Sequence, residues 1–190
     1  MKKGILIILS GPSGVGKGTV RQFLMKDKEL NLAFSVSMTT RAPRAGEVNG
    51  KDYFFVSKDE FKKALENDEL LEHATFVDNS YGTPKKYVDS LLQEGRNVLL
   101  EIDTNGALQV MKNSRDDYVS IFLTCDSLEE LEKRIRGRKS ESEKVILERL
   151  EKAKKEILLE KFYQYVVLND VPSRAADEII QIIKNKIAKA

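Results

Sequence analysis

The sequence begins with a short apolar run that leads directly into a glycine-rich loop, and this combination most constrains the fold. Residues 4–9, GILIIL, form the continuous apolar run typical of a parallel strand buried on both faces. The loop GPSGVGKGT follows at residues 11–19, and a helix is expected to begin near Gly16 and to turn three side chains inward, those of Val20, Phe23 and Leu24. A strand, a glycine loop and a helix in this order predict a phosphate-binding loop, because backbone amides and the helix dipole converge on one anion.

One position of this loop departs from the usual pattern. Lys17 supplies the positive charge expected for the outer phosphates, but Gly18 stands where a serine or threonine hydroxyl normally reaches Mg²⁺. Thr19 cannot simply replace that hydroxyl, because adjacent residues of a helix point about 100° apart. We therefore expect Thr19 to meet an inner phosphate.

Further apolar runs at 98–102, 119–124 and 165–168 predict three more strands of the central sheet. Helical patterns separate them, and an amphipathic helix is expected over 175–187, so strand and helix alternate as in a doubly wound α/β sheet. Ligands of such sheets bind at the carboxyl ends of the strands. Gly11, Asp103 and Asn169 fall at such ends.

Composition narrows the class of protein. The chain has 190 residues, which suits one compact domain, and its 41% hydrophobic and 33% charged residues indicate a folded globular protein. A net charge of +2 provides no general field for nucleic acid or an anionic membrane. The apolar run at 5–9 is too short for a secretion signal and no other run could span a membrane, so the cytoplasm is the expected location. The single Cys125 reads as a buried strand thiol that forms no intrachain disulfide.

The middle third of the chain breaks the alternation. Residues 34–83 are rich in Ser, Thr, Tyr, Phe and turn residues, which predicts a small inserted subdomain containing β-structure. Within it, Arg41 and Arg44 flank Pro43, whose ring stiffens the backbone, and Tyr53 adds a hydroxyl. A solvated basic turn is the simpler interpretation of this segment alone, but its place after a phosphate loop favours a second phosphate site.

Two later segments carry candidate functional groups. Glu101 and Asp103 end an apolar strand in LLEIDTNG and share one face of it. The charged segment 127–160 predicts helices with Leu128, Leu131 and Ile135 on one side, and Ser140 and Glu143 have the spacing of a capping box. Arg134 and Arg138 lie four residues apart and so share a helix face, where surface ion pairs are the alternative to a role in binding. Arg136 lies off that face and is expected to be solvated.

Together these motifs resemble the guanylate kinase family over nearly the whole chain. The resemblance rests on GPSGVGKG, SVSMTTRAPRAGEVNGKDYFF, LEHATF with YGT, LLEIDTNG, RIRGR and LND, in that order. It implies transfer of the γ-phosphoryl group of ATP to GMP with Mg²⁺, giving ADP and GDP, in guanine nucleotide metabolism. It also implies a P-loop kinase fold in a single domain over 1–190, with a core (1–33, 84–126, 152–190), a GMP-binding subdomain (34–83) and a helical lid (127–151).

The resemblance assigns roles residue by residue. The catalytic residues would be Lys17, Arg44, Arg138 and Arg149. ATP would be bound by Gly11, Pro12, Ser13, Gly14, Val15, Gly16, Lys17, Gly18 and Thr19, and by Arg134, Asn169 and Asp170. The phosphate of GMP would be held by Arg41, Arg44, Tyr53 and Tyr81, and its guanine read by Ser37, Glu72 and Thr83.

Glu72 has a physical reason for this role. A carboxylate can accept both the N1–H and the amine of guanine, and adenine lacks that donor pair. Taken alone, Glu72 reads as an ordinary acid on a helix surface.

Glu101 and Asp103 would complete the GMP side or orient water on Mg²⁺, which the ATP phosphates and water would chiefly hold. The family usually has aspartate at the position of Glu101 and glutamine at that of Asn105, so the division between Glu101 and Asp103 stays open.

Three other functions compete with this interpretation. A kinase for another nucleoside monophosphate, especially AMP, would share GKGT, but Glu72 and Ser37 count against it. A non-catalytic guanylate-kinase-like module that binds proteins would be expected to lose Lys17 or the lid arginines. A nucleotide-regulated switch would need motifs that the chain lacks. The expected partners are ATP and GMP, with neither nucleic acid nor membrane, as a monomer or a homodimer.

Overall fold

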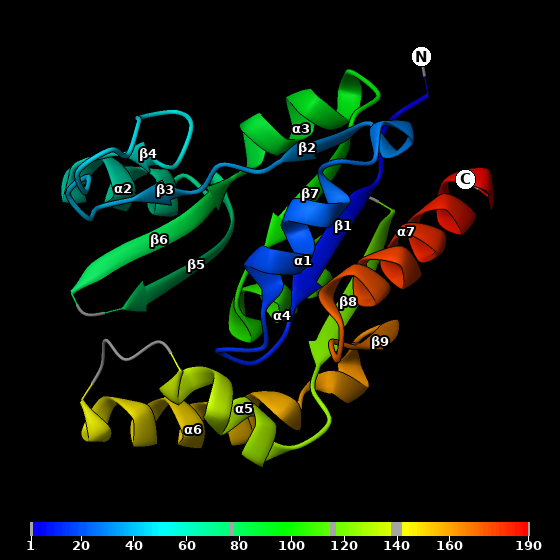
Figure 1. Cartoon of the computed structure of the whole chain (residues 1–190). Coiled ribbons are helices and arrows are strands. Elements are labelled where there is room, and N and C mark those ends of the chain that lie inside the picture. The colour runs from blue at the N-terminus through cyan, green and yellow to red at the C-terminus, as the bar shows by residue number, and fades with distance from the viewer. Residues whose placement is uncertain (1, 77, 115–116, 138–141, 190) are drawn as a thin grey trace.

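The computed structural model describes residues 2–76, 78–114, 117–137 and 142–189, and it contains two sheets (Figure 1). The larger sheet has five parallel strands in the order β2-β7-β1-β8-β9. Their bounds are β1 Leu6–Ser10, β2 Leu32–Phe34, β7 Asn97–Glu101, β8 Tyr118–Thr124 and β9 Tyr165–Leu168. The fold is therefore α/β with a central parallel sheet, as the alternation of patterns predicts.

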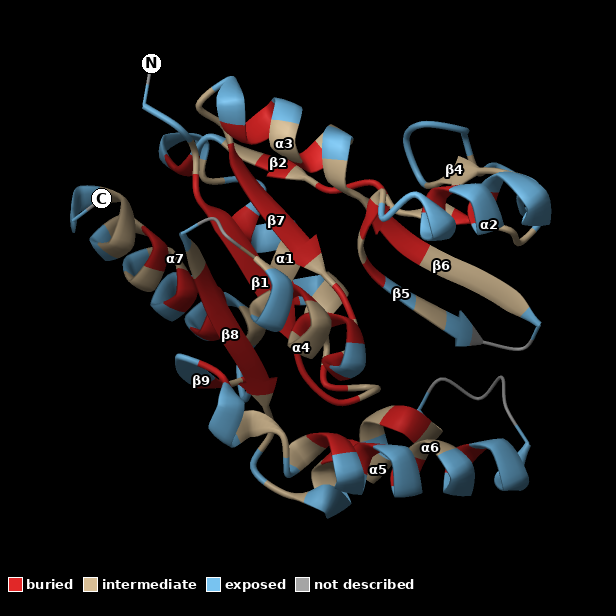
Figure 2. Cartoon of the chain, turned by 180° about the vertical axis from the view of Figure 1, so that it is seen from behind, coloured by how far each residue is buried: buried red, intermediate tan, exposed pale blue. Residues whose placement is uncertain are grey.

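The central strands of this sheet are its most buried elements. Every residue of β1 is buried, and Figure 2 shows buried residues concentrated along β1, β7 and β8. Two expectations need correction here. The strand predicted over 4–9 runs from Leu6 to Ser10, and β9 is an edge strand whose Val166 is exposed while Val167 packs in the core with α7. Cys125 follows β8 and is only half-buried.

Helices cover both faces of the central sheet. Helices α1 (Lys17–Leu24) and α7 (Pro172–Lys189) pack on the face that receives Ile7 and Leu9. Helices α3 (Lys85–Gln93) and α4 (Thr104–Asn113) pack on the face that receives Leu6 and Ile8. Alternate residues of one strand thus enter opposite cores, as strand geometry requires. Phe23, predicted to point inward, is exposed, whereas Val20 and Leu24 are buried as predicted.

The second sheet and one helix form a separate layer (left in Figure 1). Its strands run in the order β4-β3-β6-β5, with bounds β3 Met38–Thr39, β4 Phe54–Phe55, β5 Leu70–Phe76 and β6 Asn79–Pro84. Helix α2 (Lys58–Glu66) packs on it through Phe61 and Ala64. This helix begins with a complete capping box between Ser57 and Glu60, which satisfies two backbone donors of its first turn.

Helices α5 (Leu128–Arg136) and α6 (Glu143–Ile157) lie side by side at the other end of the molecule (Figure 1). Two short 3₁₀ turns, η1 (Lys28–Leu30) and η2 (Glu160–Phe162), complete the elements that the described residues form. Leu131 and Ile135 are buried as predicted, but Leu128 in the first turn of α5 is partly exposed. The cap of α6 is Ser142 rather than Ser140, which lies outside the described residues. Among those residues no helix is long and apolar enough to cross a membrane.

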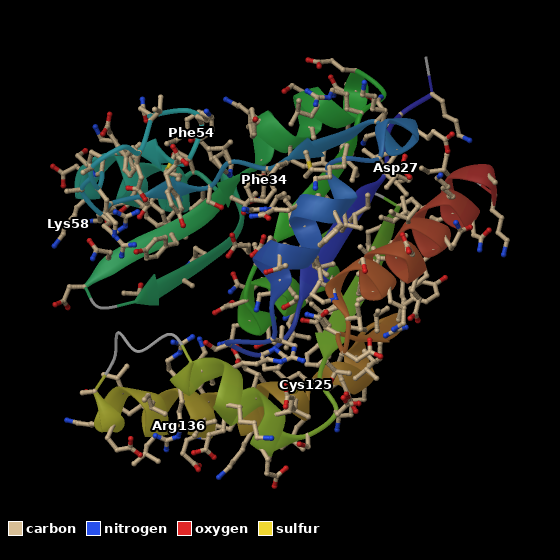
Figure 3. The ribbon with its side chains drawn as sticks, viewed as in Figure 1. Asp27, Phe34, Phe54, Lys58, Cys125 and Arg136 are labelled. Carbon is tan, nitrogen blue, oxygen red and sulfur yellow. The ribbon has the colours of Figure 1, made fainter. Side chains whose placement is uncertain are left out.

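Arg136 was expected to be solvated, and the structure gives it a structural role instead. Its guanidinium donates to both carboxylate oxygens of Glu143, at 2.6 and 2.8 Å, and to Glu132 at 2.7 Å. Figure 3 shows Arg136 on the outer helix pair, away from the central sheet. A bidentate pair of this kind joins α5 to α6 at their adjacent ends.

Asn97 joins three segments of the core. Its buried amide accepts a hydrogen bond from Ile5 N at 3.0 Å and donates one to Leu30 O at 2.7 Å. We expect Asn97→Ala to lower the free energy of unfolding by roughly 2–3 kcal/mol, because two buried backbone groups lose their partner. Urea unfolding followed by circular dichroism measures this loss. Asn105→Ala on an exposed surface is the control, and an equal effect of both variants would contradict the assignment.

Candidate active site

The phosphate loop lies between β1 and α1, as the sequence predicts. Gly14 and Gly16 adopt φ values of 88° and 97°, a left-handed region that residues with a Cβ rarely occupy. Gly16 is the amino-terminal cap of α1 and gives this helix no side-chain hydrogen bond. The first amides of α1 are therefore open to an anion. A hollow of about 280 Å³ lies over them and is lined by residues that include Gly14, Lys17, Thr19 and Glu101.

Lys17 lies inside this loop rather than in solvent. Its Nζ donates to Gly11 O at 2.7 Å and more weakly to Pro12 O at 3.3 Å. Burial lowers the pKa of Lys17, and three nearby carboxylates oppose that shift, those of Glu156, Glu101 and Asp103. The ammonium is thus held at the phosphate loop by the loop's own carbonyl groups.

Ser13 connects the loop to α6 through two side chains. Arg149 Nε and Nη2 donate to Ser13 Oγ at 3.1 and 2.9 Å, and Ser13 N donates to Glu156 Oε2 at 3.0 Å. Glu156 is 4% exposed, and sequence reasoning missed it. Its spacing of seven residues from Arg149 carried a signal, since seven residues are two helical turns and place both side chains on one face.

The remaining candidate ATP residues divide into two groups. Arg134 donates to Val15 O at 3.4 Å and to Asn169 O at 2.9 Å, and Asn169 Nδ2 donates to Val15 O at 2.7 Å, so these side chains adjoin the loop. Asp170 is instead exposed and paired with Arg174 at 2.7 Å, which lowers the pKa of its carboxyl group. Arg138 lies outside the described residues.

A second hollow, of about 230 Å³, lies between the two sheets. It brings together most of the candidate GMP residues and three others, and its lining consists of Ser37, Tyr53, Glu72, Ala74, Tyr81, Glu101, Ile102, Asp103 and Lys152. These residues come from segments that are far apart in the sequence. Lys152 was not among the predicted site residues, and its Nζ lies 3.6 Å from Asp103 and 3.6 Å from Glu156.

Glu72 is the buried acid of this second hollow. It lies on β5 and is 6% exposed, which corrects its reading as a helix-surface acid: the segment is a strand that α4 covers. Thr83 Oγ1 donates to Glu72 Oε1 at 2.6 Å. Burial raises the pKa of Glu72 to about 7, although the hydrogen bond from Thr83 acts in the opposite direction.

The basic and aromatic side chains of the second sheet form a cluster. Arg41 lies 5.4 Å from the ring centre of Tyr53, and the rings of Tyr53 and Tyr81 are 6.1 Å apart. Glu47, which sequence reasoning missed, accepts from Arg41 Nη2 at 2.8 Å and from the Arg44 amide at 2.7 Å. Tyr53 and Tyr81 of this cluster line the second hollow, whereas Arg41 and Arg44 are not among the residues that line it.

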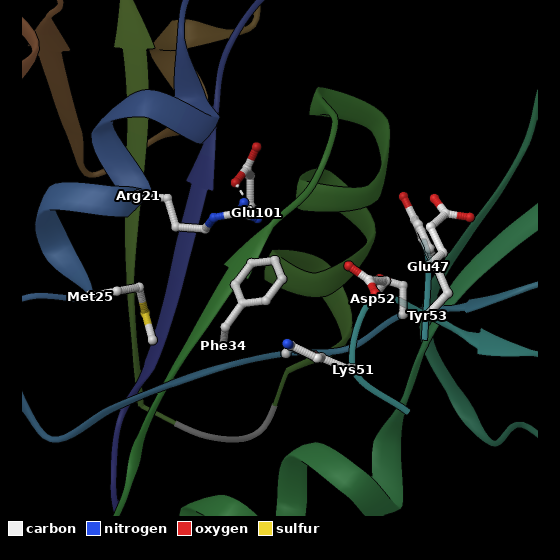
Figure 4. Close-up of a pocket in the computed structure, with 10 residues that line it drawn as sticks. Arg21, Met25, Phe34, Glu47, Lys51, Asp52, Tyr53 and Glu101 are labelled. Carbon is white, nitrogen blue, oxygen red and sulfur yellow. Dashed lines mark ion pairs between the residues drawn. The ribbon is translucent and has the colours of Figure 1, made fainter. Parts of the chain in front are cut away.

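Glu101 and Asp103 have different surroundings. Asp103 is the cap of α4 and accepts from Gly106 N at 2.8 Å, whereas Glu101 forms an ion pair with Arg21 at 3.1 Å. Figure 4 shows this pair beside Phe34, whose ring centre lies 4.3 Å from the Arg21 guanidinium carbon. Arg21, Phe34 and Glu101 line a cavity of about 500 Å³, and Lys51 and Asp52 line it too. This cavity shares Ser37, Tyr53 and Glu101 with the second hollow.

The phosphate hollow has donor atoms that suit Mg²⁺. Glu101 Oε2 forms the ion pair with Arg21 at 3.1 Å, whereas Oε1 would lie 3.7 Å from a Cβ on Gly18. Glu101 therefore extends toward the space that a longer residue at position 18 would occupy. Mg²⁺ prefers such oxygen atoms and keeps much of its water. Within the described ranges, there is no group of three or more His, Cys, Asp or Glu residues that could hold a metal ion.

A parallel α/β sheet with a glycine loop, a buried lysine and an uncapped helix at its carboxyl edge defines a P-loop nucleotide-binding protein. The family model described as guanylate kinase matches residues 3–189. The chain belongs to the guanylate kinase family, and its P-loop kinase fold agrees with the prediction.

Relatives support this assignment at the level of the whole domain. The chain is 56% identical to a guanylate kinase of Mesoplasma florum over 95% of its own length and 61% of that relative, so it spans about three-fifths of that protein. It is 53% identical to a guanylate kinase of Lactobacillus johnsonii, over 96% of the chain and 89% of the relative. The crystal structure of guanylate kinase from Anaplasma phagocytophilum aligns with a TM-score of 0.76 at 37% identity, covering 97% of this chain and 87% of that one.

Proposed function

We propose that this protein transfers the γ-phosphoryl group of ATP to GMP, giving ADP and GDP. The observation that carries the proposal is a buried carboxylate, Glu72, in a hollow that shares Glu101 with the hollow over the phosphate loop. A carboxylate positioned by Thr83 suits the paired N1–H and amine donors of guanine. The guanylate kinase family to which the chain belongs supports the same reaction.

The loop at residues 11–19 binds the phosphates of ATP in this proposal. Its amides and Lys17 meet the outer phosphates, and Arg149 reaches them from its present contact with Ser13. Arg134, Asn169 and Asp170 bind the remainder of ATP, and Asp170 then exchanges its Arg174 contact for the nucleotide.

The phosphate of GMP is held by Arg41, Arg44, Tyr53 and Tyr81. The acceptor is an oxygen that is already anionic, so the reaction needs no general base. Catalysis then consists of aligning two phosphates and neutralising the charge between them, which suits Lys17 and the arginines Arg44, Arg138 and Arg149.

Glu101 and Asp103 are the residues proposed to orient the water molecules of Mg²⁺. The bound metal would supply charge neutralisation on the ATP phosphates. Glu101 is the better candidate, because its Oε1 lies toward Gly18 in the phosphate hollow, whereas Asp103 caps α4 and its carboxylate adjoins Lys152.

We also propose that the chain works as one domain with a core, a GMP-binding subdomain at 34–83 and a lid at 127–151. The second hollow is lined by residues of the GMP-binding subdomain and of the core, and the phosphate hollow lies within the core. Closure over both nucleotides would exclude water that could otherwise accept the phosphoryl group.

The proposal is tested by the choice of acceptor. We expect ADP release from ATP in the presence of GMP and at least about 100-fold less with AMP, because adenine leaves the Glu72 carboxylate unpaired. A coupled spectrophotometric assay with each monophosphate in turn measures this ratio. Equal or greater activity with AMP would overturn the proposal in favour of an AMP kinase, and no release with any monophosphate would favour a non-catalytic module.

A further inference from the structure

Helix α4 carries a glycine in its first turn that the backbone does not require. Gly106 is buried and has ordinary helical φ, since it is absent from the residues with positive φ. Glycine weakens a helix relative to alanine, so its presence needs another cause. Gly11 differs, because a Cβ there would lie 2.2 Å from a backbone oxygen, that of Leu123.

A Cβ on Gly106 would conflict with one group only, the carboxylate of Glu72. It would lie 2.7 Å from Oε2 and 3.2 Å from Cδ of Glu72, and its next neighbour, an oxygen of Asp103, would be at an ordinary 3.4 Å. Contacts under 3.0 Å are essentially never made by real Cβ atoms. Either α4 or the Glu72 side chain would therefore have to move.

The backbones of α4 and β5 are tied together beside this contact. Gln109 Oε1 accepts from His73 N at 3.1 Å, and Gln109 Nε2 donates to His73 O at 2.9 Å. His73 adjoins Glu72 in the sequence, so these two bonds from the Gln109 side chain oppose a shift of α4 away from this part of β5. The Glu72 carboxylate accepts from Thr83 Oγ1 at 2.6 Å and is the far end of a flexible side chain, so it is the part that can yield.

We propose that Gly106 is a positioning residue for recognition of the acceptor base: its missing side chain provides the space in which the Glu72 carboxylate is held toward guanine. The inference rests on the proposed function and deepens it. It extends base recognition from the residues that would touch guanine to one on a different helix.

Gly106→Ala tests this arrangement. We expect the KM for GMP to rise roughly tenfold or more, because displacement of a binding group by a fraction of an ångström is costly, while the KM for ATP stays within about twofold. The melting temperature should be unchanged or higher, since alanine favours the helix. Asn105→Ala, in the same turn but exposed, is the matched control and should leave both KM values unchanged.

A double variant, in which Gly106→Ala is added to Glu72→Asp, provides the decisive test. Aspartate is one methylene shorter and leaves room for the new methyl group, so adding Gly106→Ala to Glu72→Asp should raise the KM for GMP by less than about twofold. The same tenfold rise in both backgrounds would overturn the inference, as would a GMP KM that Gly106→Ala leaves unchanged. Failure of the unsubstituted protein to phosphorylate GMP would overturn the proposed function and this inference with it.

Discussion

Glu72→Gln is expected to stabilise the protein above pH 7 and to remove most of its activity on GMP. Glutamine offers one acceptor oxygen, and its amide NH₂ is a donor facing the second donor of guanine. The value of kcat/KM for GMP should therefore fall by roughly 10²- to 10⁴-fold. The hydrogen bond from Thr83 can persist, because the glutamine oxygen still accepts it. Steady-state kinetics with GMP and AMP measure the loss of guanine preference.

The stability effect follows from the pKa of Glu72. Its carboxyl group has a pKa of about 7 in the folded protein against an ordinary value of 4.5, so between those pH values the folded state holds a proton that the unfolded state has released. The stability of the unsubstituted protein therefore falls as pH rises from about 4.5 to 7, by roughly 3 kcal/mol. Glu72→Gln should not show this fall in stability, because the glutamine side chain has no proton to release in this pH range.

Thermal unfolding at two pH values tests the sign. The melting temperature of Glu72→Gln should exceed that of the unsubstituted protein at pH 8.5 and should approach it at pH 4.5. Glu66→Gln is a control on an exposed acid whose side chain is 60% accessible. A melting temperature lowered at both pH values would mean that the Glu72 charge is needed for folding.

Lys17→Met is expected to lower kcat by about 10³-fold or more. Methionine has a similar length but no charge, and one preorganised cation at a transferring phosphoryl group contributes on this scale. The buried environment that lowers the pKa of Lys17 suits a neutral side chain, so the variant should fold. The affinity for GMP should change by less than about threefold, because Lys17 lies in the phosphate hollow rather than beside Glu72.

Kinetics and calorimetric titration with GMP separate these two effects. Lys62→Met removes an exposed lysine of α2 and should leave kcat unchanged. A kcat for Lys17→Met within tenfold of the original would contradict the role of Lys17, and an equal loss of GMP affinity would indicate a general distortion of the site.

Local patterns predicted much of the fold and the phosphate half of the site. The run at 4–9 and the glycines after it act on adjacent residues, so the strand, the loop and α1 follow from nearest neighbours. Side-chain environments in the other half were harder to predict. Glu72 reads as a surface acid because nothing near it in the sequence reveals that α4 covers its strand. Arg136 reads as solvated because its partner Glu143 lies beyond the end of its own helix.

The sequence by itself determined the nucleotide-binding class, the family and most of the residues that gather at the site, because these depend on residue type, order and short-range spacing. Tertiary structure alone decided what those residues experience. The raised pKa of Glu72, the contact of Glu156 with Ser13 and the space beside Gly106 each join residues separated by tens of positions or more. Desolvation and steric exclusion act through space, so they arise only when the chain packs distant elements together.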